Sequence, residues 1–133
     1  MIFVDASALV AIVCGEPEAP ALVARLEAAA EAITSPIAIY EAVRAVRRVL
    51  RGSHEDSRQD VMDLIARAGI GVVCTTSADA ELALSAFARF GKGQGHPAQL
   101  NMGDCFAYAA ARRHGAVLLC KGDDFPQTDI RMA

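Results

Sequence analysis

Residues 1–13 read MIFVDASALVAIV, and this stretch decides the fold class. It joins a short apolar strand, Ile2–Asp5, to a helix, Ser7–Val13, that is apolar enough to be buried. Asp5 stands at the junction, although carboxylates are rarely buried unless they are paired or bound to a cation. The stretch therefore predicts a buried strand that leads into a buried helix, with a functional acid between them.

The same alternation of strand and helix continues along the chain. Further strands are predicted at Ala32–Ser35, Ile70–Thr75 and Ala116–Cys120, and a brief one near Asp129–Met132 would close the sheet. The predicted helices are Glu18–Ala30, Pro36–Leu50, His54–Ala68, Ala80–Phe90 and Gly103–His114. This order favours a three-layer α/β/α fold with a central parallel sheet of four to five short strands, in one domain spanning residues 1–133.

Composition narrows the class of protein. Of 133 residues, 53% are hydrophobic and 22% are charged, as expected for a globular domain with a core. No apolar run approaches the roughly 18–20 residues of a membrane span, and Asp5 interrupts the N-terminal apolar stretch, so neither a membrane protein nor a signal peptide is expected. The four cysteines show no CxxC spacing, and we expect them to be reduced and buried in a cytoplasmic protein.

The net charge of −3 argues against a general nucleic-acid-binding surface. A nucleic-acid substrate would have to be held locally, through metal-bound phosphate and a few arginines. Charge alone therefore slightly disfavours a nuclease.

Five acids lie at the polar ends of predicted apolar segments: Asp5, Glu41, Asp104, Asp123 and Asp124. In parallel sheets, sites form beyond the carboxyl ends of the strands, where Asp5 and the last two aspartates fall. Clustered carboxylates repel one another and raise each other's pKa, and a divalent metal ion is the usual remedy. Ligation by oxygen alone favours Mg²⁺, with Mn²⁺ as a substitute. The acids together predict one shared metal site.

Two of these acids also have a purely structural explanation, which the sequence leaves open. Asp5 could cap the helix that follows it, and Ser7 could be a second cap or could hold a metal-bound water. Asn101 and Asp104 have the spacing of a capping box, in which the acid reaches back to the cap N–H group.

The other acids have structural explanations as well. Glu41, Arg44, Arg48 and Arg51 form one polar helical stripe that solvent exposure alone would explain. The last two aspartates could be turn residues after Gly122. A shared site nevertheless explains better why all these acids recur at strand ends and at the heads of apolar helices.

Several blocks of sequence carry a family resemblance: MIFVDASA at 1–8, Glu41 on a helix, LNMGDCFAYA at 100–109, LLCKGDDF at 118–125 and Thr128–Ile130. These blocks resemble the PIN-domain ribonucleases, and most of all the VapC-type toxins of type II toxin–antitoxin modules. The resemblance covers nearly the whole chain, and the block at 100–109 is highly specific to that subgroup.

The resemblance implies a PIN-like fold and a Mg²⁺-dependent endoribonuclease. By this resemblance the catalytic residues are Asp5, Ser7, Glu41, Asp104 and one or both of Asp123 and Asp124. Those expected to bind the metal are Asp5, Glu41, Asp104 and Asp124, the last ranked above Asp123 because it precedes Phe125. Arg44, Arg48, Arg51 and Lys92 are candidates for contact with the RNA backbone.

The resemblance also implies partners. We expect a cognate antitoxin protein that inserts an arginine among the acids, an RNA substrate (tRNA, mRNA or rRNA), and a homodimer without a membrane association.

Two other functions remain open at this point. One is a Mg²⁺-dependent phosphohydrolase or phosphotransfer domain of doubly wound fold. However, a haloacid-dehalogenase-like enzyme would need an Asp where Ser7 stands, and a receiver domain would need an Asp after Ile70–Thr75. The other is a catalytically inert PIN-like binding module, which the complete set of acids disfavours.

Overall fold

The computed structural model describes all residues from 1 to 133 and contains one four-stranded parallel sheet. The strands are β1 (Ile2–Val4), β2 (Ala32–Thr34), β3 (Gly71–Val72) and β4 (Val117–Leu119). Their order is β3-β2-β1-β4, with Ile2 opposite Ala32 on one side and Val117 on the other. The predicted three-layer α/β/α fold with a central parallel sheet is confirmed.

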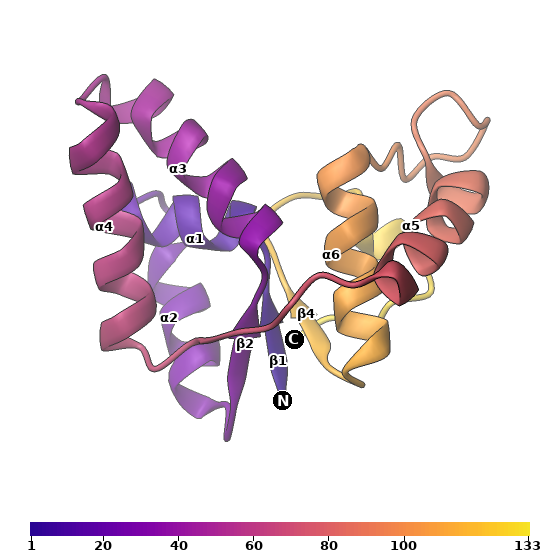
Figure 1. Ribbon diagram of the computed structural model, residues 1–133. Coiled ribbons are helices and arrows are strands. Elements are labelled where there is room, and N and C mark those ends of the chain that lie inside the picture. Colours follow the sequence, from indigo (N-terminus) through magenta and orange to yellow (C-terminus); the bar gives the residue numbers. More distant parts are fainter.

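Six helices cover the sheet on its two faces. They are α1 (Ala6–Val13), α2 (Ala19–Ala28), α3 (Pro36–Leu50), α4 (His54–Arg67), α5 (Ser77–Phe90) and α6 (Met102–Arg113), and a short 3₁₀ helix, η1 (Phe125–Gln127), follows β4. Helices α1–α4 lie on one side of the sheet and α5 and α6 on the other (Figure 1). None of these helices has the length and apolar character needed to cross a membrane.

The two faces of β1 explain the two halves of the core. Because successive strand side chains point to opposite faces, Phe3 packs with α5 and α6, whereas Ile2 and Val4 pack with α1–α4. Leu118 and Leu119 of β4 divide in the same way. The central strands are buried on both faces, which is why their sequences are continuously apolar.

Two predicted strands are shorter than expected. The strand predicted at Ile70–Thr75 contains only Gly71–Val72, because it lies at the sheet edge, where both residues are exposed. The segment Asp129–Met132 makes a single bridge, between Leu118 and Met132, and is not a fifth strand. At both places the chain has a neighbouring strand on one side only.

The cysteine prediction was right in part. All four cysteines are free thiols. Cys105 is buried, and Cys14 and Cys120 are half-buried, but Cys74 is exposed because it follows the short edge strand β3. The expectation that all four are buried was therefore wrong for Cys74.

Side-chain and backbone hydrogen bonds fix the carboxyl ends of the strands to one another. The buried hydroxyl of Thr34, at the end of β2, donates to the carbonyl oxygen of Val4 at 2.8 Å. The backbone N–H of Asp5 donates to the carbonyl oxygen of Leu119 at 2.9 Å. The residues that follow β1, β2 and β4 therefore begin from one rigid edge.

Candidate active site

Asp5 occupies the junction between β1 and α1. It is only 5% exposed, and one carboxylate oxygen accepts hydrogen bonds from the Ser7 N–H group at 2.9 Å and the Ser7 hydroxyl at 2.5 Å. Asp5 is thus the N-cap of α1 and also a buried carboxylate beside the cleft described below. The capping role considered from the sequence is present, but it does not account for the burial of a charge.

Ser7 connects Asp5 to the loop that follows β4. Its hydroxyl donates to Asp5 and accepts a hydrogen bond from the backbone N–H of Lys121 at 3.0 Å. Ser7 lies inside α1 and is not a second cap. Since its one proton is committed to Asp5, Ser7 orients that carboxylate.

Glu41 projects from α3 toward the head of α6. Ser35 caps α3 by accepting from the Ala38 N–H group, and Pro36 begins the helix, as the sequence predicts. The Glu41 carboxylate lies so close to Gly103 that a β-carbon built there would fall 1.7 Å from its Oε1 atom. Glycine is therefore required at position 103 for the Glu41 side chain to lie where it does.

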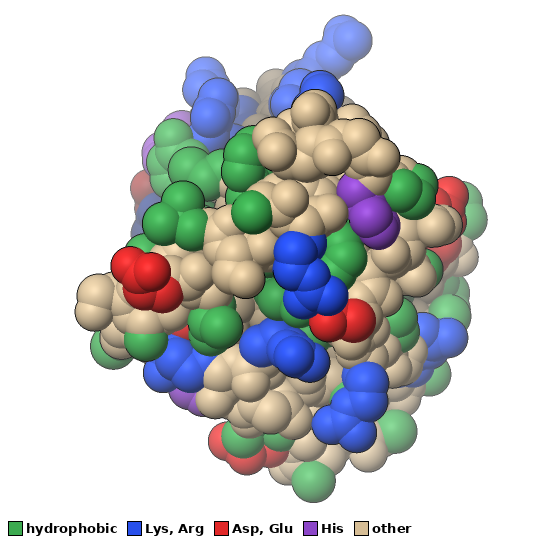
Figure 2. Space-filling view, turned by 90° about the vertical axis from the view of Figure 1, so that its right-hand side faces the viewer, with side chains coloured by type: hydrophobic (Ala, Val, Ile, Leu, Met, Phe, Trp, Pro, Cys, Tyr) green, Lys and Arg blue, Asp and Glu red, His purple; other side chains and the backbone are tan.

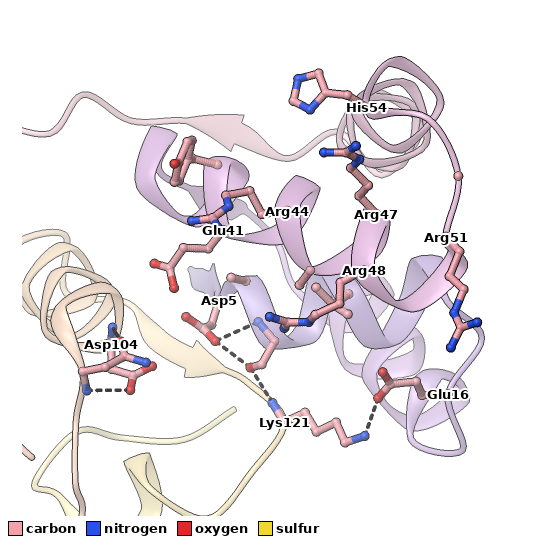
Figure 3. A pocket seen from close by; sticks show the side chains of 17 residues that line it. Asp5, Glu16, Glu41, Arg44, Arg47, Arg48, Arg51, His54, Asp104 and Lys121 are labelled. Carbon is pink, nitrogen blue, oxygen red and sulfur yellow. Dashed lines mark hydrogen bonds and ion pairs between the residues drawn. The ribbon is translucent and has the colours of Figure 1, made fainter.

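Asp104 lies at the third position of α6, in a capping box. Its carboxylate accepts from the Asn101 N–H group at 2.9 Å, and its own N–H group donates to the Asn101 side chain at 2.9 Å. The structural explanation of Asp104 is thus also present. The capping box fixes the head of α6, and the carboxylate faces the same cleft as Asp5 and Glu41 (Figure 3).

Burial disfavours the ionisation of all three acids, and neighbouring acids add to this for Glu41 and Asp104. Burial, followed by the charges of Asp5 and Asp104, raises the pKa of Glu41 to about 7. Burial and the charges of Asp5 and Asp124 raise the pKa of Asp104 to about 6, against the hydrogen bond from Asn101. Burial also raises the pKa of Asp5, and the hydrogen bonds from Ser7 only partly offset this. No lysine, arginine or histidine side chain forms a salt bridge with any of the three.

The two C-terminal candidates face different environments. The charge of Asp124 contributes to the raised pKa of both Asp104 and the Cys120 thiol, so Asp124 lies within electrostatic reach of the cluster. Asp123 instead lines a separate cavity of about 460 Å³, together with Arg25 of α2 and Glu18, the residue before that helix. Neither aspartate lines the main cleft.

The main cleft has a volume of about 1040 Å³ and contains the three acids and a row of cations. It is lined by Asp5, Ser7, Glu41 and Asp104 and by Arg44, Arg47, Arg48, Arg51, His54 and Lys121. Figure 3 shows the arginines spaced along α3, leading away from Glu41. Lys92 does not line the cleft, because it lies in the exposed loop after α5.

Three of the cationic residues that line the cleft were not anticipated from the sequence. Arg47 follows Arg44 by three residues, and Arg48 and Arg51 follow it by four and seven, so all four lie on one helix face. Helical spacing could therefore have predicted that Arg47 lines the cleft. Lys121 gave no such signal. Its ammonium is paired with Glu16 and, at 3.3 Å, with Glu18 at the mouth of the cleft.

His54 is the third of these residues, and it opens α4 directly after the end of α3. Its side chain is exposed and lines the cleft.

By donor type and charge, the acids fit a hard divalent ion. All are oxygen donors, and burial and neighbouring acids raise the pKa of Glu41 and of Asp104 to about 7 and about 6. The side chains as they lie do not form a group of three or more ligands that could hold a metal ion. Coordination by the whole cluster would therefore require side-chain rotation.

Comparison with known proteins gives a consistent result. The family model described as PIN domain matches residues 2–131. The chain is 43% identical over 142 residues to VapC ribonuclease R02377 of Rhizobium meliloti (strain 1021), covering 98% of this chain and 99% of that protein. It is 42% identical over 130 residues to Ribonuclease VapC42 of Mycobacterium tuberculosis (strain ATCC 25618 / H37Rv), covering 98% and 97%.

A solved structure supports the fold. The crystal structure of Mycobacterium tuberculosis VapC20, described as a sarcin-ricin loop cleaving toxin, matches with a TM-score of 0.78. The match covers 100% of this chain and 98% of that one at 17% identity, so it concerns the fold alone.

Proposed function

The chain belongs to the PIN-domain family and, within it, to the VapC ribonucleases, and from this we propose that it is a Mg²⁺-dependent endoribonuclease in which Mn²⁺ can substitute. We also propose that residues 1–133 form one PIN domain, since the family match spans residues 2–131. Family membership argues against the phosphohydrolase alternative.

One observation carries the metal-dependent part of this proposal. Three carboxylates from separate elements, Asp5, Glu41 and Asp104, share one cleft without a cationic partner, and burial together with neighbouring acids raises the pKa of Glu41 and of Asp104. Folding gains nothing from such mutual repulsion, whereas a divalent ion would relieve it. The acids also disfavour the alternative of a catalytically inert binding module, because such a module would gain nothing from clustered, unneutralised carboxylates.

The residues have separate roles in this proposal. Asp5, Glu41 and Asp104, with Asp124 as the fourth acid, would hold the ion, which would supply an activated water and polarise the scissile phosphate. Ser7 orients Asp5 by its two hydrogen bonds. The arginines of α3 would bind backbone phosphates on either side of the scissile bond.

The proposal extends to the cellular role. We propose that the chain is the toxin of a type II toxin–antitoxin pair that acts in the cytoplasm as a homodimer on tRNA, mRNA or rRNA. Its cognate antitoxin would insert an arginine among Asp5, Glu41 and Asp104, because an unneutralised acidic cluster is a good site for a guanidinium. Most residues that line the cleft are polar or charged, which suits such an insertion.

A cleavage assay with matched variants tests the proposal. End-labelled RNA is incubated with the wild-type protein in Mg²⁺ and in EDTA, and then with Asp5→Asn and with Asp60→Asn, an exposed acid on α4 outside the cleft. We expect cleavage by the wild type and by Asp60→Asn in Mg²⁺ only, and none by Asp5→Asn. Equal cleavage in EDTA, or by Asp5→Asn, would exclude the metal role of the cluster.

A further inference from the structure

Tyr40 is the large apolar side chain that lines the cleft beside the acids, and nothing described above assigns it a role. It immediately precedes Glu41 on α3 and is 62% exposed. An aromatic ring left in water gives up the free energy of burial, and Tyr40 is more exposed than every other aromatic residue of the chain. The Tyr40 ring is therefore available to contact a molecule bound in the cleft.

The surroundings of the ring select the chemistry of that partner. The guanidinium of Arg44, one helical turn further along α3, lies 5.7 Å from the centre of the Tyr40 ring. An aromatic ring beside a guanidinium is the combination on which nucleic-acid bases stack. The exposed fraction of the ring leaves it accessible from the cleft.

The charge distribution indicates where a polynucleotide would run. Five of the 13 lysines and arginines line this one cleft, in a chain whose net charge is −3: Arg44, Arg47, Arg48, Arg51 and Lys121. On the face that includes α5, basic side chains are interspersed with acidic and apolar ones (Figure 2). A backbone bound along the α3 arginines would bring a base beside Tyr40 as its phosphate approaches the acids.

We infer that Tyr40 is a base-stacking residue of the cleft, which holds one unpaired base of a bound RNA beside the acids. A paired base already stacks on both neighbours within a duplex and cannot offer its face to Tyr40 without leaving the helix. The inference rests on the proposed ribonuclease function, and it is tested by binding, which can be read even where cleavage fails.

The first experiment measures binding without turnover. The probe is a fluorescein-labelled RNA oligonucleotide of mixed sequence, single-stranded or annealed to its complement, titrated in Mg²⁺ with the Asp104→Asn protein. Adding Tyr40→Ala should weaken binding of the single strand roughly tenfold, as expected for the loss of one stacked base, and should change duplex binding little. Adding Leu84→Ala, which removes an exposed side chain of α5 outside the cleft, should change neither.

A second experiment reports on stacking directly. The chain contains no tryptophan, so Tyr40→Trp places a single tryptophan at the proposed contact, and a separate Leu84→Trp variant places one outside the cleft. Single-stranded RNA should quench the fluorescence of Trp in the first variant and leave that of the second unchanged.

Three outcomes would overturn the inference. One is equal single-strand affinity with and without Tyr40→Ala. Another is an equal loss of affinity for single strand and duplex. The third is a fluorescence change at position 40 that follows protein concentration and not RNA, which would assign Tyr40 to a protein interface. Failure of the wild type to cleave any RNA would instead count against the proposed function.

Discussion

Helices α5 and α6 pack against each other and begin with the same local motif, yet the acid in each motif has the opposite electrostatic environment. Thr76 and Asp79 form a capping box at the head of α5, and Asn101 and Asp104 form one at the head of α6. Asp79 is 1% exposed and accepts a hydrogen bond from the Arg113 guanidinium at 2.6 Å. Asp104 is half-buried beside other acids and has no cationic partner.

The difference appears in the pKa of each acid. Burial raises the pKa of Asp79, but the hydrogen bonds from Arg113 and Thr76 outweigh it, so that the pKa is lowered overall. Burial and neighbouring acids raise the pKa of Asp104 to about 6. The capping box is thus common to both acids and does not separate them. What separates them is the charge that faces each acid, a guanidinium at Asp79 and other carboxylates at Asp104.

The largest contrast should come from replacing each acid by asparagine and measuring RNA cleavage. Asp104→Asn keeps the size of the side chain and part of its capping ability, but it removes a charge from the cluster. We expect cleavage to fall by at least about 100-fold, with an unchanged circular dichroism spectrum. Asp79→Asn should retain full activity per folded molecule. Full activity in Asp104→Asn would reduce Asp104 to a helix cap.

The reverse contrast should appear in stability. Asp79→Asn leaves the Arg113 guanidinium without its charged partner, and Arg113 also donates to the Cys74 carbonyl oxygen at 2.9 Å. We expect the free energy of unfolding in urea to fall by about 2 kcal/mol, below the loss for a fully buried pair because Arg113 is partly exposed. A loss below about 0.5 kcal/mol would show that the pair does not hold α5 and α6 together.

The second residue of each helix offers a finer test. This position is Ala78 in α5 and Gly103 in α6. Gly103→Ala should favour the helix slightly, but the new β-carbon would displace the Glu41 carboxylate from its present position. We expect cleavage to fall about tenfold while the thermal midpoint stays equal or rises. A parallel loss of stability and activity would mean that the backbone, and not the Glu41 side chain, gives way.

Much of this arrangement could be predicted from the sequence. The apolar stretches predicted the buried strands, Ser35 and Pro36 predicted the start of α3, and the strand-end rule predicted that Asp5 would lie beside a site. These features depend on residues close together in sequence. The pattern of buried and exposed residues and the helix caps encode them locally.

The remaining features depend on how the elements dock. The Asp79–Arg113 pair joins residues 34 apart, and the hydrogen bond from Lys121 to Ser7 joins residues 114 apart. The approach of Glu41 to Gly103 likewise requires α3 and α6 to be packed. No periodicity in the sequence records such contacts, so the capping boxes alone do not separate Asp104 from Asp79; the apolar helix that Asp104 heads and the family resemblance singled out Asp104.

The thermal shift caused by a divalent metal ion should distinguish Asp104 from Asp79 in the absence of RNA. If the cluster binds Mg²⁺ or Mn²⁺, a tenfold excess over Kd stabilises the fold by about 1.4 kcal/mol, or roughly 4 °C in the thermal midpoint. Differential scanning fluorimetry should show this shift for the wild type and for Asp79→Asn, but not for Asp104→Asn. A shift of the same size in Asp104→Asn would locate metal binding elsewhere.

The smallest effect should be a difference in pH dependence, measured without metal. Glu41, whose pKa rises from 4.5 to about 7, and Asp104, whose pKa rises from 3.8 to about 6, bind more protons in the folded than in the unfolded state between about pH 4 and 7. The thermal midpoint measured without metal should therefore decline as pH rises through that range. Asp79 has a lowered pKa, so its stabilisation is present above 3.8 and is lost as the pH falls below that value.

Single substitutions separate these two branches of the pH profile. Thermal midpoints between pH 3 and 8 should show that Asp104→Asn flattens the decline toward neutral pH and leaves the acid branch intact. Asp79→Asn should flatten the acid branch only. Glu41→Gln should act like Asp104→Asn, since each substitution removes one of the two carboxyls whose pKa is raised, and Asp104→Asn also removes a charge that raises the pKa of Glu41. If Asp104→Asn left the neutral branch unchanged, the repulsion attributed to the cluster would be too weak to recruit a metal ion.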